Sequence, residues 1–241
     1  MCIRDRDYPN MINAWKQRAF RDGIVLKFIS LDLPIEDKGK IIQAFSNEFT
    51  SKTKLVHITH MINWSGQILP VKEIADEAKK RNIEVLVDAA HTFAQLDYKI
   101  PDLNCDYFGT SLHKWLCAPI GSGMLWVRKK KIKNLYPLFA ATDPESEDIR
   151  KFESLGTRSF AIEQAIGQAI DFHHWIGAER KQKRLHYLKN YWVNQVKDFP
   201  GVKIHTSLDI EFGCAICLFS IEGKIQLRLP KLFKENLEFM Q

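Results

Sequence analysis

IEVLVDAAHTFAQLDYKIPDLNCDYFGTSLHK, residues 83–114, is the stretch that decides the fold. It opens on an apolar, β-branched run at 83–87 that ends in Asp88, and a second strand-like run follows at 105–110. A polar turn that begins at Ser111 comes directly after the second run. Both runs therefore end in polar side chains, and the carboxyl ends of parallel strands are where ligands bind in open α/β sheets.

Further strands and a helix are expected on either side of this stretch. Residues 54–60 (KLVHITH) are expected to form a short buried strand. Residues 71–81 carry apolar side chains at helical spacing after Pro70, which suits the first turn of a helix. Another strand is expected from Met124 onward. Strands separated by helical stretches predict a mostly parallel sheet with helices on its faces, so the fold class is α/β.

The pattern changes at about residue 162. Residues 162–198 have helical spacing and are expected to form one long helix or two consecutive helices. Short strands are expected from Val202 and from Cys214, and the tail at 233–241 is helix-like. Such a succession is typical of the opening of a smaller α+β domain, which we expect to be incomplete in this chain.

The composition is that of an ordinary globular protein. The chain has 241 residues, a formal net charge of +6, 45% hydrophobic residues and 27% charged residues. These fractions exclude a disordered or collagen-like chain. No apolar run reaches the ~20 residues of a membrane span, and the polar start gives no sign of a signal peptide, so we expect no membrane partner. Five cysteines, an odd count, favour reduced thiols and a cytoplasmic protein.

Much of the excess positive charge lies in two short runs, residues 128–133 and 179–184. A nucleic-acid surface would interleave such charges with aromatic side chains or carry a binding motif, and neither is present. We therefore expect solvated surface and no nucleic-acid partner, with a basic nucleic-acid-binding module as the weakest alternative function. The pair Cys214 and Cys217 lacks a second ligand pair at zinc spacing, so no metal site is predicted.

Lys114 is the residue of the polar turn that points to chemistry. A lysine whose pKa is lowered in a confined site forms a Schiff base with a carbonyl, and pyridoxal phosphate (PLP) is the common aldehyde partner. PLP also needs an acid opposite its ring nitrogen, which suits Asp88, and phosphate ligands, which suit Ser111 and His113. Each of these residues alone is more often an ordinary surface or turn residue, so it is their combination that indicates a cofactor site.

Several motifs taken together resemble one known family. They are DYPNMINAWKQRAFRDGI from Asp7, THMINWSGQILPVKEIADEAKKRNIEVLVDAAHTFAQ from Thr59, CDYFGTSLHKW from Cys105, APIGSG from Ala118 and FESLGT from Phe152. The family is the class V aminotransferases, among the fold-type I PLP-dependent enzymes; the likeness is strongest to the isopenicillin N epimerase-like group, and cysteine desulfurases are related. Its most specific part is D-A-A-H with S-L-H-K, 26 positions apart from Asp88 to Lys114.

The resemblance implies a role for each matching residue. Lys114 resembles the Schiff-base lysine, and Asp88 resembles the carboxylate that pairs with the ring nitrogen. His91 and Asn63 are similar to the side chains beside the ring hydroxyl. The implied catalytic residues are therefore Lys114, Asp88 and His91.

The remaining matching positions concern the phosphate and a second subunit. Ser111 and His113 resemble phosphate ligands. Gly156 and Thr157 resemble the segment that reaches the phosphate of the neighbouring subunit's cofactor. The resemblance thus implies a homodimer with shared active sites.

The resemblance also implies a fold-type I PLP-transferase large domain, with a mostly parallel sheet, plus an incomplete α+β small domain. We expect residues 7–160 to be part of the PLP-binding large domain and 161–241 to be the start of a truncated C-terminal small domain. Residues 1–6 do not look like the family and are expected to be a non-native start.

Family members carry a preceding segment, with a phosphate-binding turn and the side chain that stacks on the ring. Their substrate-carboxylate arginine lies near the C-terminus. Arg228 stands in a different context and is not assigned to that role.

The predicted function is a PLP-dependent enzyme that acts on an amino acid by transamination or epimerisation, as a class V aminotransferase-like transferase or isomerase. Cysteine desulfurase or lyase chemistry on the same scaffold is an alternative, because the early steps are shared. A further alternative is a non-catalytic fragment that only folds and dimerises.

Overall fold

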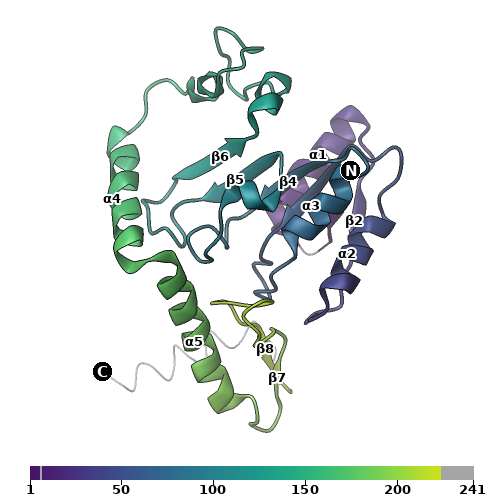
Figure 1. The fold of residues 1–241 in the computed structure, drawn as a ribbon, viewed down its shortest axis with the longest axis vertical. Helices are drawn as coiled ribbons and strands as arrows, with labels where there is room; N and C mark the ends of the chain where they lie inside the picture. The colour runs from purple at the N-terminus through teal and green to yellow at the C-terminus, as the bar shows by residue number, and fades with distance from the viewer. Residues whose placement is uncertain (6, 224–241) are drawn as a thin grey trace.

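A six-stranded sheet forms the centre of the protein. The computed structural model describes residues 1–5 and 7–223, and Figure 1 shows the sheet with helices beside it and an arm of two long helices. The strands are ordered β2-β1-β3-β4-β5-β6 across the sheet. They are β1 (Cys2–Arg4), β2 (Lys27–Ile29), β3 (Leu55–Thr59), β4 (Glu84–Asp88), β5 (Tyr107–Ser111) and β6 (Gly123–Val127). Among these described strands only β6 runs antiparallel to its neighbour, which confirms the prediction of a mostly parallel sheet.

Five α-helices and three short 3₁₀ helices accompany the sheet in the described part of the chain. The α-helices are α1 (Pro9–Asp22), α2 (Lys38–Asn47), α3 (Val71–Lys79), α4 (Phe160–Ile176) and α5 (Ala178–Val196). The 3₁₀ helices are η1 (Ile100–Leu103), η2 (Lys129–Asn134) and η3 (Ile149–Glu153). Pro70 immediately precedes α3, as the sequence predicted.

The two faces of β3 have different neighbours, because side chains alternate along a strand. Val56 and Ile58 are fully buried in the core that α2 and α3 cover. His57 and Thr59 point to the opposite face, where Trp15 of α1 donates a hydrogen bond to His57. The sheet thus has an apolar face under α2 and α3 and a partly polar face on the side of α1.

Residues 160–221 form the long arm of Figure 1 and a small second sheet. Gly177, with a φ of 85°, ends α4 and begins α5, so the helical stretch is two consecutive helices. The second sheet pairs β7 (Val202–Ile204) with β8 (Phe219–Ile221) in antiparallel orientation. Arg228 and the predicted helical tail lie outside the described residues. Nothing in the fold tests the expected division at residue 160, which stays a prediction.

Several contacts tie this second part to the loops of the sheet, and two of them concern the loops that follow β5 and β3. Ala169 of α4 packs in a small apolar cluster with Leu112, Leu116 and Ala118, the loop that follows β5. Thr206 donates a hydrogen bond of 2.5 Å to the carbonyl of Ser65, in the turn that follows β3. Both loops at the carboxyl ends of the strands are therefore supported from outside the sheet.

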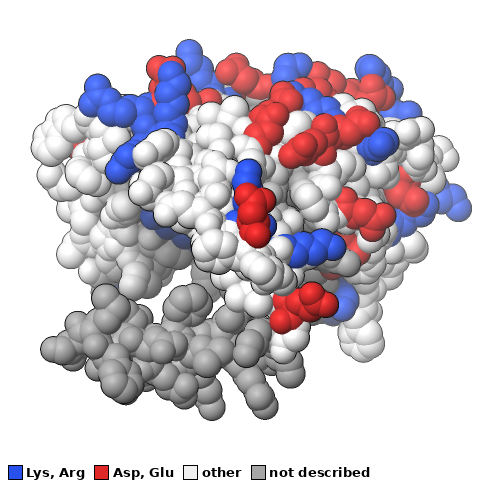
Figure 2. All heavy atoms as spheres, turned by 90° about the horizontal axis from the view of Figure 1, so that it is seen from below, with Lys and Arg blue, Asp and Glu red and all other residues white. Residues whose placement is uncertain are grey.

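Acidic and basic side chains are intermingled on the face that Figure 2 shows. In the first basic run, Lys131 pairs with Glu84 and Lys133 with Glu147; in the second, Lys183 pairs with Glu179. These acidic partners reduce the positive potential that a phosphate backbone would require. No helix among the described residues is long and apolar enough to cross a membrane.

Candidate active site

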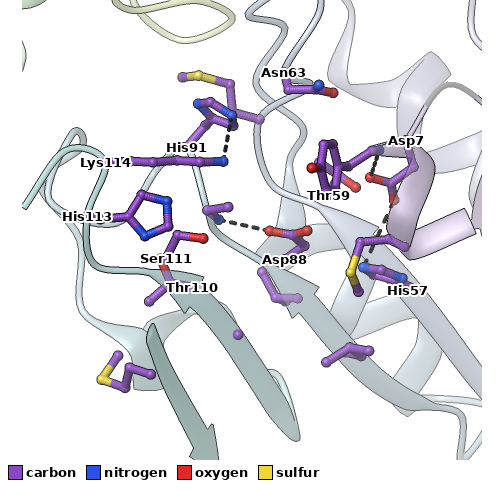
Figure 3. Close-up of a pocket in the computed structure, with 18 residues that line it drawn as sticks. Asp7, His57, Thr59, Asn63, Asp88, His91, Thr110, Ser111, His113 and Lys114 are labelled. Carbon is purple, nitrogen blue, oxygen red and sulfur yellow. Dashed lines mark hydrogen bonds and ion pairs between the residues drawn. The ribbon is translucent and has the colours of Figure 1, made fainter. Parts of the chain in front are cut away.

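A cavity of about 450 Å³ opens at the carboxyl ends of β3, β4 and β5. Figure 3 shows the polar side chains that line it, and these come from four separate segments of the chain, within residues 7–8, 57–63, 88–91 and 110–114. Six of the eight residues singled out in the sequence line this cavity: Asn63, Asp88, His91, Ser111, His113 and Lys114. Gly156 and Thr157 do not line it; both are exposed in the segment before α4. The sheet topology therefore collects residues that are up to 51 positions apart (114 − 63 = 51).

Asp88 is the last residue of β4 and lies on the floor of the cavity. Thr59 of β3 and Gly109 of β5 are its partners in register on either side. The backbone N–H of Ala90 donates a hydrogen bond of 2.9 Å to Asp88 Oδ1. Burial raises the pKa of Asp88, and this hydrogen bond partly opposes the shift. A buried carboxyl of this kind gains most from a cation placed beside it.

Lys114 and His91 meet at the side of the cavity, as Figure 3 shows. Lys114 Nζ lies 3.0 Å from His91 Nε2, and the indole N–H of Trp115 donates to His91 Nδ1 over 3.4 Å. Burial lowers the pKa of Lys114, against the attraction of Asp88. Burial, together with the Lys114 charge, lowers the pKa of His91 to about 4, so His91 is neutral at pH 7. A lysine of lowered pKa beside a neutral imidazole is suited to act as a nucleophilic amine.

The loop after β5 holds Lys114 by backbone hydrogen bonds. Cys117 N–H donates to the Lys114 carbonyl over 3.2 Å, and Ala118 N–H donates to the Leu112 carbonyl over 3.1 Å. Cys117 has a φ of 65°, the left-handed conformation that a tight turn of this kind requires. Within the same loop, His113 Nδ1 lies 3.3 Å from the Ser122 carbonyl. The lysine is thus carried by a closed turn rather than by an open loop.

Asn63 enters the cavity from the turn after β3. The N–H of Gly66 donates to the Ile62 carbonyl over 2.8 Å, which closes the turn. Asn63 Oδ1 is buried and has no hydrogen-bond partner among the residues that the structure describes. A buried amide oxygen without a partner costs free energy, so its position suits contact with a bound polar group.

The cavity has further polar lining residues that the sequence analysis did not single out as site residues: Asp7, Tyr8, His57, Thr59 and Thr110. The available signal was alternation, since His57 and Thr59 are polar positions two apart in an otherwise apolar strand next to Asp88. Asp7 carried no such signal, because its proximity depends on how the chain enters α1. Its side chain is almost fully buried.

Comparison with known proteins identifies a family that this chain matches. The model of the family Aminotransferase class-V matches residues 2–224. Isopenicillin N epimerase of Streptomyces clavuligerus is 29% identical over an alignment of 244 positions, which covers 95% of this chain and 59% of that protein. A protein named as a probable cysteine desulfurase of Halalkalibacterium halodurans is 30% identical over 214 residues, covering 84% of this chain and 51% of that protein.

Solved structures agree on the fold. The structure of C-DES with glycine covalently linked to its PLP cofactor has a TM-score of 0.83 at 21% identity, over 97% of this chain and 64% of that one. The chain therefore spans about half to two thirds of the length of the proteins it matches. Because the family model covers nearly all of the described residues, the chain belongs to the class-V aminotransferase family.

Proposed function

We propose that the protein is a PLP-dependent enzyme that acts on an amino acid by transamination or epimerisation, with Lys114 as the residue that holds the cofactor. The donor set fits the group: an amine of lowered pKa for the aldehyde, a buried carboxyl for the ring nitrogen, and the unpartnered Oδ1 of Asn63 for a polar ring substituent. The family and its PLP-linked structural relative support the same cofactor.

One observation carries the proposal: Asp88 at the end of β4 and Lys114 in the turn after β5 line the same cavity, and each influences the other's charge. A nucleophilic amine and a carboxylate are the two groups that PLP chemistry requires from the protein. An ordinary surface lysine would be solvated and would have no buried carboxyl facing it.

Each residue has a definite task in this proposal. Lys114 would hold the cofactor through its aldehyde, and its amine would serve as the base that takes the proton from the substrate α-carbon. Asp88 would favour the protonated form of the ring nitrogen, while His91 and Asn63 would orient the ring through its hydroxyl. Ser111 and His113 would donate hydrogen bonds to the phosphate. When bound, the cofactor supplies an electron sink for the carbanion.

The second candidate is cysteine desulfurase or lyase chemistry at the same residues. The observation that favours it is the match to a protein named as a probable cysteine desulfurase, at 30% identity. Incubation with single amino acids separates the two. Sulfide release from cysteine favours the second candidate, whereas formation of a keto acid or loss of α-carbon chirality favours the first. A folded protein that does neither with any amino acid, and does not bind PLP, is the non-catalytic alternative.

The assignment of Lys114 is tested by titrating the purified protein with PLP and recording the absorption band of the bound cofactor. Lys114→Ala is expected to abolish the band, because the variant lacks the amine. Lys130→Ala, a change at an exposed lysine outside the cavity, serves as the matched control and should keep it. A band that survives in the Lys114→Ala protein and is still reducible by borohydride contradicts the assignment.

We further propose a homodimer in which Gly156 and Thr157 of one subunit face the cofactor of the other, with residues 7–160 and 161–241 as large and small domains. The segment that leads to Gly156 is rich in exposed apolar side chains; Leu138 is 93% exposed. Apolar surface of this kind is typical of subunit interfaces. All five cysteines are free thiols, which supports a cytoplasmic location.

A further inference from the structure

His57 is a buried titratable residue that the proposed chemistry does not use. It lies in the middle of β3, two residues before Thr59, and its side chain is completely buried. Strand alternation turns it toward the cavity, where Figure 3 shows it below Asp7, with Asp88 to its left. Burial lowers the pKa of His57, so the ring is neutral at pH 7.

The hydrogen bond from Trp15 determines which nitrogen of the neutral His57 ring carries the proton. The indole Nε1–H of Trp15 donates a hydrogen bond of 2.9 Å to His57 Nδ1. An indole nitrogen can only donate, so Nδ1 must accept and the proton of the neutral imidazole resides on Nε2. The two rings meet edge to face, with centroids 6.2 Å apart, which fixes this arrangement.

His57 Nε2 faces the carboxylate of Asp7. The distance from Nε2 to Asp7 Oδ2 is 4.0 Å, and neither atom has a hydrogen-bond partner in the described part of the chain. The other oxygen, Asp7 Oδ1, accepts a hydrogen bond of 2.6 Å from the N–H of Tyr8. A protonated Asp7 could not donate to His57, because Trp15 keeps the proton on Nε2. Burial raises the pKa of Asp7, and this geometry opposes that shift, because both carboxylate oxygens face N–H groups and therefore favour the charged form.

We propose that Trp15 and His57 are a positioning pair that keeps Asp7 as a charged carboxylate beside Asp88, so that the cavity floor carries two negative charges for one bound cation. The inference deepens the proposed function and rests on it, because the cation would be the protonated ring nitrogen of PLP. The negative charge of Asp7 raises the pKa of Asp88, and it would likewise raise the pKa of a ring nitrogen bound beside it. The groups of opposite sign are Lys114, which acts on Asp88, and Arg4, which acts on Asp7.

The first test uses nitrogen and carbon NMR on the purified protein without cofactor. In the wild-type protein the shifts of His57 are expected to show a protonated Nε2 and an unprotonated Nδ1. In Trp15→Phe the ring is free to carry its proton on Nδ1 and to accept from a protonated Asp7. The proton affinity of Asp7 is then expected to rise about tenfold. Protonation of Nδ1 in the wild type, or an unchanged Asp7 titration in the variant, overturns the proposal.

The second test compares binding of PLP with binding of an analogue whose ring nitrogen is replaced by carbon. Trp15→Phe and Asp7→Asn should each weaken PLP binding about tenfold relative to the analogue, because only PLP has a ring nitrogen to protonate. The double variant should lose no more than either single one, since both act through one charge. Trp175→Phe, at a tryptophan that is 79% exposed, is the matched control.

These outcomes separate the positioning pair from simple packing and from the proposed function. Equal weakening of both compounds means that Trp15 and His57 only pack, and overturns the proposal. If neither compound binds the wild-type protein, the proposed function fails, and the NMR measurement still decides whether Trp15 holds Asp7 in its charged form.

Discussion

Asp88 has the clearest single-residue consequence, because it combines burial with a position opposite Lys114. An ion pair with a ring nitrogen shifts a pKa by about 1–3 units. Asp88→Ala is therefore expected to lower turnover by about 10- to 1,000-fold while the protein retains some cofactor through Lys114 and the phosphate ligands. Turnover and cofactor content, measured together on the proposed substrate class, check this.

The control for this change is Asp102→Ala, which removes an exposed acid in η1, outside the cavity. It is expected to leave turnover and cofactor content unchanged. Turnover that is equal in the Asp88→Ala protein and the wild type would show that Asp88 does not support the ring nitrogen.

His60 gives a prediction about pH and stability. It is fully buried, its Nδ1 lies 3.0 Å from Thr92 Oγ1, and burial lowers its pKa to about 4. The unfolded chain binds a proton at this residue below about pH 6.5, whereas the folded protein binds it only near pH 4. The free energy of unfolding should therefore fall with decreasing pH across that window, by roughly 3 kcal/mol in total from His60.

Urea unfolding at several pH values between 4 and 7 measures this slope. His57 and His91, also of lowered pKa, act in the same direction, while Asp7 and Asp88, of raised pKa, act against it. His60→Gln is expected to be less stable at pH 7 but to have a shallower dependence on pH. An identical slope in the variant and the wild type would rule out the buried neutral state of His60.

Among the helices and strands, those with a long and clear residue pattern could be predicted from the sequence, and the short ones could not. β3 and β4 have five residues each with a β-branched, largely apolar centre, and both were predicted within a residue or two. β1 and β2 have three residues each, too few for periodicity to show, and neither was predicted. α2 was not predicted either: its one clear signal is the N-cap Asp37, whose side chain accepts from Lys40 N–H.

The same reasoning applies to the candidate site. The turn after β5 was predicted because Lys114 lies in a polar turn directly after a strand and matches a family motif. The side chains on the polar face of β3 could not be assigned, since a lone polar residue in a strand is more often packed than functional. Asp7 reaches the cavity through tertiary packing, for which a single sequence carries no signal.

The turn between β3 and α3 gives a prediction about an element. Gly66 has a φ of +72°, and a Cβ there would lie 2.3 Å from the carbonyl oxygen of Ile216. Gly66→Ala is expected to destabilise the protein by at least about 2 kcal/mol. It should also weaken PLP binding, because the displaced turn carries Asn63. Chemical denaturation and PLP titration measure the two effects.

Gly23→Ala is the matched control for the close contact. Gly23 has a similar φ of +67°, but a Cβ there would meet nothing within 4 Å. This variant should lose only the ~1 kcal/mol of left-handed strain and keep its PLP affinity. Equal losses in the two variants would mean that the turn is not held against residue 216.

For the whole molecule, the proposed dimer predicts the mass that sedimentation measures and the apolar surface through which the two subunits associate. Sedimentation should give twice the 28.0 kDa of the chain. Leu138→Asp is expected to produce a monomer, because it buries a charge at the proposed interface. Phe20→Asp, on the outer side of α1 and also more than nine-tenths exposed, is the control that should remain dimeric. A monomeric wild type at micromolar concentration contradicts the shared-site proposal.

The arrangement of the whole molecule depends on the loops at one edge of the sheet. α4 supports the loop of Lys114, and the segment around Thr206 supports the turn of Asn63. The long helices and the second sheet therefore stabilise the cavity without lining most of it. These contacts help a chain that spans 59% of the length of the isopenicillin N epimerase relative to bring the family's motif residues together.

The central claim is that Lys114 holds the cofactor, and one measurement tests it most directly. The purified protein is incubated with PLP, reduced with borohydride and digested, and the pyridoxyl-bearing peptide is sequenced by mass spectrometry. The account predicts a single modified peptide, labelled at Lys114. Label at another lysine, or none on a protein that is folded, would contradict it.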